Sequence, residues 1–121
     1  MSHEHDSNSD VAQILGLERE ILRALCASPH LTGDRRTLLR PLASHVWRDP
    51  EHRVVYEALL RTLTRDPGAL RSELPATATR MGFPDVEWSE YFQCGDTSQI
   101  AEVQSRIRAL GAASAQLPFR P

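Results

Sequence analysis

The segment V-W-R-D-P-E-H-R-V-V-Y-E-A-L-L-R-T-L, residues 46–63, carries the clearest helix start and the strongest helical periodicity in the chain. Asp49 is suited to cap a helix, because its carboxylate accepts hydrogen bonds from the unpaired amides of the first turn. Pro50 follows at the first helical position, where its missing N–H is not needed. Ring-bearing and aliphatic side chains then recur along one helical face, at His52, Val55, Tyr56, Leu59 and Leu63. We therefore predict a helix whose buried face lies at the centre of the core.

Helical patterns also lie on both sides of this segment. The first runs from Val11 to Ala27 and ends at Ser28-Pro29, because a residue before Pro avoids the α region. Further helices are expected from residue 32 or 33 to about 42, over 69–81 in one or two pieces interrupted at Pro75, in a short piece capped by Asp85, and from 96 or 97 to about 110, with Gly111 as its C-cap. No segment alternates as a strand does. The sequence predicts an all-α fold, a single orthogonal helical bundle of about five or six helices.

The length of 121 residues suits one domain. We expect a disordered tail over residues 1–9, which are polar, a helical domain over 10–111, and a C-terminal tail over 112–121, which holds small residues and two prolines. The core is expected to include apolar residues of the first and central helices, namely Ile21, Leu25, Val55, Tyr56 and Leu59.

Composition points to a protein of the cytoplasm. No apolar run approaches the roughly 20 residues that span a bilayer, and the N-terminus lacks the features of a secretory signal. The two cysteines, Cys26 and Cys94, are far apart and are expected to be reduced thiols. His3 and His5 are two potential ligands on a predicted tail, which do not make a metal site. We expect no metal and no other cofactor.

Two segments resemble the N-terminal domain of DnaB-type replicative DNA helicases. In Trp47–Leu59, an aromatic residue, Asp-Pro, His-Arg and an apolar-aromatic pair follow one another in the order typical of that family. Glu18–Leu25, followed by Ser28-Pro29, is similar to the first helix of the family's domain and the turn after it. The resemblance covers residues 17–65 well and the remainder loosely. It implies the helical head of the collar domain, standing without the ATPase domain.

The chemistry of the helicase motor is absent from the sequence. Its ATPase domain needs a phosphate-binding loop whose Lys reaches the β- and γ-phosphates. All 14 basic residues of this chain are Arg, and no Gly-rich loop precedes a helix. Cys94 with a histidine is a conceivable nucleophile and base, but no pattern places such residues together. We expect the protein not to be an enzyme.

The resemblance implies contact with other proteins, because the collar domain of replicative helicases takes part in helicase–primase contact. We therefore expect a non-enzymatic interaction module that acts on a replicative helicase or a primase as adaptor or regulator. Aromatic and Arg side chains are the usual anchors of such surfaces. The expected partner-binding residues are Arg36, Arg40, Trp47, Arg48 and Arg53.

Structural roles are also expected for three side chains of this region. Trp47 is either a staple that packs on the helix it precedes, which we favour, or an exposed anchor for a partner. His52 is expected at the edge of the core, bonded to a backbone carbonyl. Arg53 is expected to pair with an acid of another helix.

The family's head continues into a helical hairpin that forms dimers, but only one helix follows the head here, so the oligomeric state stays undetermined.

The alternative function is that of a small helical DNA-binding regulator. Arg35, Arg36 and Arg40 would lie on its recognition helix, and Arg is suited to bidentate contact with guanine. The formal net charge of −2 argues against this alternative, because it gives no general attraction for phosphates. We expect nucleic-acid binding to be weak or absent.

Overall fold

The computed structural model describes residues 3–27, 35–62, 67–92 and 100–116. Within these ranges the chain forms helices and no strand, which confirms the predicted all-α class. The α-helices are α1 (His3–Ala27), α2 (Arg35–Leu39), α3 (Pro50–Arg61), α4 (Pro67–Arg80) and α5 (Ile100–Gln116). Two short 3₁₀ segments accompany them, η2 (Arg40–Leu42) and η3 (Trp88–Glu90).

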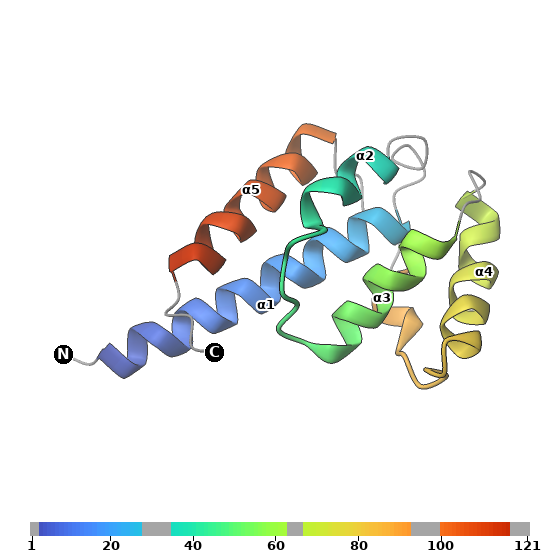
Figure 1. Ribbon diagram of the computed structural model, residues 1–121, viewed down its shortest axis with the longest axis horizontal. Helices are drawn as coiled ribbons and strands as arrows, with labels where there is room; N and C mark the ends of the chain where they lie inside the picture. Colours follow the sequence, from blue (N-terminus) through green and yellow to red (C-terminus); the bar gives the residue numbers. More distant parts are fainter. Residues whose placement is uncertain (1–2, 28–34, 63–66, 93–99, 117–121) are drawn as a thin grey trace.

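The longest helix, α1, contacts α3, α4 and α5 (Figure 1). The last helix, α5, packs along α1, while α3 contacts both α1 and α4. Their apolar faces meet in one core, and the five residues predicted for it are all buried there. Those residues are Ile21, Leu25, Val55, Tyr56 and Leu59.

The central helix begins as the sequence predicts. The Asp49 side chain accepts a hydrogen bond from the backbone N–H of Glu51 at 2.8 Å, and Pro50 is the first helical residue. The helix ends at Arg61, two residues before Leu63. Thr62 lies beyond that end, and its hydroxyl donates to the carbonyl of Ala58 at 2.8 Å.

The outer helices extend further than predicted. Helix α1 begins at His3, so residues 3–9 are not the disordered tail that the polar composition indicates. No Pro or Gly interrupts residues 3–15, so no residue of this stretch is a strong helix breaker. Helix α5 continues through Gly111 to Gln116, where a C-cap and a tail were predicted. Three alanines within residues 112–115 favour this continuation.

Helix α4 is continuous across Pro75, which corrects the predicted interruption. A proline inside a helix removes one backbone hydrogen bond and strains the preceding turn. Here Leu70 and Leu74 lie before Pro75 and Ala78 lies after it, and all three are fully buried or nearly so. Burial on both sides of Pro75 holds the two halves of the helix in one line.

Candidate interaction site

A fully buried carboxylate fixes the loop that leads into α3. The side chain of Glu18, on α1, is 0% exposed. Its Oε2 lies 2.7 Å from Nε2 of His45 and accepts the backbone N–H of Arg48 at 2.8 Å. Its Oε1 lies 2.8 Å from Nδ1 of His52. One carboxylate therefore ties α1 to both ends of the 45–48 loop and to the first turn of α3.

Glu18 is ionised in this position. Burial by itself would raise the pKa of its carboxyl group, but the hydrogen bonds from His45, His52 and the Arg48 backbone outweigh burial and lower the pKa to about 2. Since an ionised carboxylate can only accept, Nε2 of His45 and Nδ1 of His52 must carry protons. The histidines are thus held in defined orientations by the acid.

The fixed loop presents Trp47 to the central helix. The Trp47 ring lies 5.1 Å from the ring of Tyr56 on α3, and 4.8 Å edge-on from the ring of His45. Trp47 is half-buried and packs against the core. The favoured interpretation of Trp47 as a staple agrees with this packing, while its remaining surface borders the hollow described next.

The turn that follows α4 forms the other wall of this hollow. Gly82 has a φ of +98°, which L side chains rarely adopt. The N–H of Gly82 donates to the Thr79 carbonyl at 2.9 Å, and the N–H of Phe83 donates to the Ala78 carbonyl at 2.8 Å. This pair of bonds is a Schellman motif, which ends α4 and turns the chain toward α3. Phe83 remains 48% exposed at this turn.

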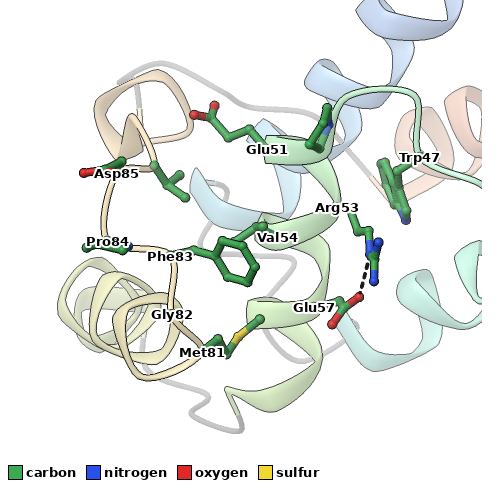
Figure 2. Close-up of a pocket in the computed structure, with 12 residues that line it drawn as sticks. Trp47, Glu51, Arg53, Val54, Glu57, Met81, Gly82, Phe83, Pro84 and Asp85 are labelled. Atoms are coloured by element: carbon green, nitrogen blue, oxygen red, sulfur yellow. Dashed lines mark hydrogen bonds and ion pairs between the residues drawn. The ribbon is translucent and has the colours of Figure 1, made fainter.

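A groove of about 470 Å³ lies between α3, the Trp47 loop and the 81–86 turn. Figure 2 shows the ring of Phe83 in front of Val54, with Met81 beside it. Trp47 lies at one end of the view and Asp85 at the other. We call this hollow the Phe83 groove. It is lined by Trp47, Pro50, Glu51, Arg53, Val54, Glu57, Met81, Gly82, Phe83, Pro84, Asp85 and Val86.

The charges around the Phe83 groove are of two kinds. Glu57 is neutralised within α3, because Arg53 Nε lies 3.1 Å and Arg61 Nη1 3.3 Å from its carboxylate oxygens. Glu51 is held instead by neutral donors. Its Oε1 accepts the Tyr91 hydroxyl at 2.7 Å, and its Oε2 accepts the backbone N–H of Glu87 at 3.3 Å. Glu51 therefore has a fixed position and makes no ion pair with another described residue.

The Tyr91 hydroxyl is a permanent donor to Glu51. Tyr91 is 2% exposed, and burial, followed by the hydrogen bond to Glu51, raises the pKa of its hydroxyl. The hydroxyl thus stays protonated and remains a donor. Glu51 keeps one orientation at the edge of the Phe83 groove.

The structure brings together only part of the predicted partner-binding set. Trp47 and Arg53 both line the Phe83 groove. Arg48 lines a second hollow, of about 570 Å³, between the 41–48 segment and α5. Arg36 and Arg40 are exposed on α2 and η2 and line neither hollow.

Two predicted side-chain partners are wrong. His52 bonds the buried carboxylate of Glu18 and not a backbone carbonyl. Arg53, which is 69% exposed, pairs with Glu57 of its own helix and not with an acid of another helix. In the second case the i,i+4 spacing within α3 already offered the nearer partner.

Sequence reasoning missed most of the Phe83 groove. Met81 and Phe83 belong to the turn after α4, and nothing in their spacing indicates that the turn folds back on α3. The available signal was the Gly82-Phe83-Pro84 sequence, a turn that contains a large aromatic residue. Glu51 lies in the first turn of α3, where an acid is favourable for the helix dipole alone, and its partner Tyr91 lies 40 residues away.

Other kinds of site find no support in the part of the chain that the structure describes. No group of three His, Cys, Asp or Glu side chains there is arranged to hold a metal ion. No helix among the described residues is long and apolar enough to cross a membrane. The chain matches no family model, and neither the curated proteins nor the solved structures contain a match to it.

Proposed function

We propose that the protein is a non-enzymatic interaction module that binds another protein through the Phe83 groove. The observation that carries this proposal is the apolar surface of the groove. Phe83 is 48% exposed and lies over Val54 and Met81, with Trp47 at one end (Figure 2). Aromatic side chains in a concave apolar surface are typical anchors for a protein partner.

The walls of the groove are rigidly supported. Glu18 fixes the loop that holds Trp47, and the Schellman motif fixes the turn that holds Phe83. Contacts that are ordered before binding reduce the entropy lost when a partner is bound. This preorganisation favours a binding function over an accidental surface hollow.

We further propose that the partner is a replicative helicase or a primase of the same cell, and that the protein acts on it as an adaptor or regulator. The support is the resemblance of Trp47–Leu59 and Glu18–Leu25 to the helicase collar domain. Both segments contribute to the site, because Glu18 anchors the loop and Trp47 and Val54 line the groove.

The test is to titrate the purified protein against the helicase and the primase of its own organism by calorimetry. The proposal expects saturable binding to at least one of them. The double variant Arg36→Glu with Arg40→Glu should bind as the wild type does, because these residues lie outside the groove. Binding to neither protein would contradict the proposed partner. Binding abolished by the charge reversals would move the interface to α2.

A DNA-binding regulator is the second candidate. Arg36 and Arg40 are exposed and make no ion pair with another described residue, so both are available to phosphates or guanine. A sequence-specific, nanomolar gel shift at physiological salt would place this candidate first. We expect only weak binding that is lost as salt is raised, because so few cations neutralise few phosphates.

A further inference from the structure

We infer that the Phe83 groove takes a helical segment that carries a large apolar side chain and, on the same face, an Arg or Lys. This inference rests on the proposed function and adds the chemistry of the partner. Its basis is the charge that surrounds the apolar centre of the groove. Glu51, Glu57 and Asp85 line it, against the single cation Arg53.

Arg53, the cation among these lining residues, already pairs with Glu57 of the same helix. Arg53 and Arg61 both contact Glu57, so these three side chains together carry one positive charge and do not attract a cation of a partner. Glu51 and Asp85 are different, since neither makes an ion pair with another described residue. The end of the groove opposite Trp47 therefore presents two acidic side chains to a partner (Figure 2).

Glu51 is suited to receive a cation. Its carboxylate is oriented by the Tyr91 hydroxyl and the Glu87 N–H, and both of these donors are neutral. A guanidinium or ammonium group that reaches Glu51 would supply the charge that these donors do not. The same two acids repel phosphate groups, so charge complementarity points to a basic polypeptide segment and away from nucleic acid.

The walls of the Phe83 groove favour a helical partner segment. The walls of the groove are α3, the Trp47 loop and the turn after α4, and no strand in the described part of the chain presents an edge for β-augmentation. An amphipathic helix instead places apolar and basic side chains on one face at i, i+3 and i+4. Its apolar residue would contact Phe83, Val54 and Met81, while its cation reaches Glu51 and Asp85.

The test uses two synthetic alanine-rich peptides of roughly 15 residues, a length at which an isolated helix becomes possible. One carries two Leu one turn apart and two Arg in the next turn of the same face. The other has Glu in place of both Arg. Each peptide is added to the ¹⁵N-labelled full chain, and the amide resonances are followed. The Arg peptide should shift Val54, Met81 and Phe83 and leave Leu60 in place, and the Glu peptide should shift none of them.

Matched variants locate the cation. Glu51→Gln and Asp85→Asn should each weaken binding of the Arg peptide by about two- to fivefold, as expected for exposed charge pairs. Glu73→Gln is the control, because Glu73 is exposed on α4 and does not line the groove. It should leave the affinity unchanged. Added salt should weaken binding of the Arg peptide to the wild type.

Several outcomes would overturn the inference. Equal shifts with both peptides would show that charge does not select the occupant. No shift with either peptide, while helicase or primase still binds, would reject the basic helix and leave the proposed function standing. Concentration-dependent shifts of the groove amides without peptide would identify a second copy of the chain as the occupant.

Discussion

At the scale of single residues, Glu18 lies in an environment that is costly for a charged group. It is a charged group with no exposed surface, and it is stabilised by two histidines and one backbone N–H. Breaking a buried charged network is costly, because the remaining polar groups lose their partners. The orientation of the Trp47 loop therefore depends on this one side chain.

Glu18→Gln should lower the free energy of unfolding by about 2–4 kcal/mol, because the amide cannot accept all three hydrogen bonds. The control is Glu20→Gln on the same helix. Glu20 is 57% exposed and lies 3.6 Å from Arg106, so its loss should be below about 1 kcal/mol. Denaturant unfolding followed by circular dichroism measures both. Similar losses for the two variants would show that the Glu18 network contributes little.

The same carboxylate predicts a pH dependence. The pKa of Glu18 is about 2 in the folded protein, below its ordinary value of 4.5. A lowered pKa gives stability that is fully present above the unfolded value and is lost as pH falls through the folded one. The stability advantage of the wild type over Glu18→Gln should thus shrink between pH 4.5 and about 2. An advantage that stays constant over this range would contradict the ionised state of Glu18.

The sequence could place Glu18 on a helix but not identify its partners. His45 and His52 are 27 and 34 residues away, and a glutamate beside an Arg on an amphipathic helix normally faces solvent. The spacing predicts His52 on the buried face of α3, and the structure confirms it. Its bonding partner depends on how α1 crosses α3, and local periodicity does not contain that information.

At the scale of elements, α3 is the best predicted part of the fold. Its cap, its first residue and its buried face follow from local rules, because each depends on neighbours within one or two turns. Leu59 lies on the buried face and is 1% exposed, whereas Glu57 is half-buried and forms its ion pairs with described residues within the helix.

Leu59→Ala should therefore cost about 2–5 kcal/mol, since it leaves a cavity in the core. Glu57→Ala should cost less than about 1 kcal/mol, because i,i+4 ion pairs on a helix surface contribute little. Thermal and urea unfolding of the two variants provide the comparison. Small and equal losses would be incompatible with the assigned buried face.

Helix α4 shows where local rules fail. Pro75 predicts a break, yet tertiary packing of Leu70, Leu74 and Ala78 keeps the helix continuous. A proline in a helix interior is about 3 kcal/mol less favourable than alanine. Pro75→Ala should therefore raise stability by about 1–3 kcal/mol, measured as an increase in the urea midpoint. A lower midpoint would mean that the proline ring itself supplies needed packing.

At the scale of the whole molecule, the bundle class was predictable and the Phe83 groove was not. The class follows from the helical periodicity of several segments. The groove is made by residues from two segments, 47–57 and 81–86, which meet only after α3 and α4 have packed together. Of the five predicted partner-binding residues, only Trp47 and Arg53 line the groove. Exposed arginines occur on several helices, so residue type alone does not indicate which of them border the groove.

The whole chain should neither bind Mg-ATP tightly nor hydrolyse it. The sequence contains no Lys and hence no phosphate-loop lysine. Calorimetric titration should give no heat of a micromolar site, and phosphate release should stay at the level of buffer alone. A micromolar ATP site would require a mode of phosphate binding that does not depend on Lys.

We propose the Phe83 groove as the surface that binds the partner. Phe83 and Leu60 make a matched pair, because their side chains are 48% and 47% exposed but only Phe83 lines the groove. The decisive measurement is the affinity of wild type, Phe83→Ser and Leu60→Ser for the helicase and the primase of the same organism. We predict that Phe83→Ser weakens binding at least about tenfold, which corresponds to about 1.4 kcal/mol, and that Leu60→Ser binds as the wild type does. Equal affinity of Phe83→Ser and wild type for a partner that binds would contradict binding through the Phe83 groove.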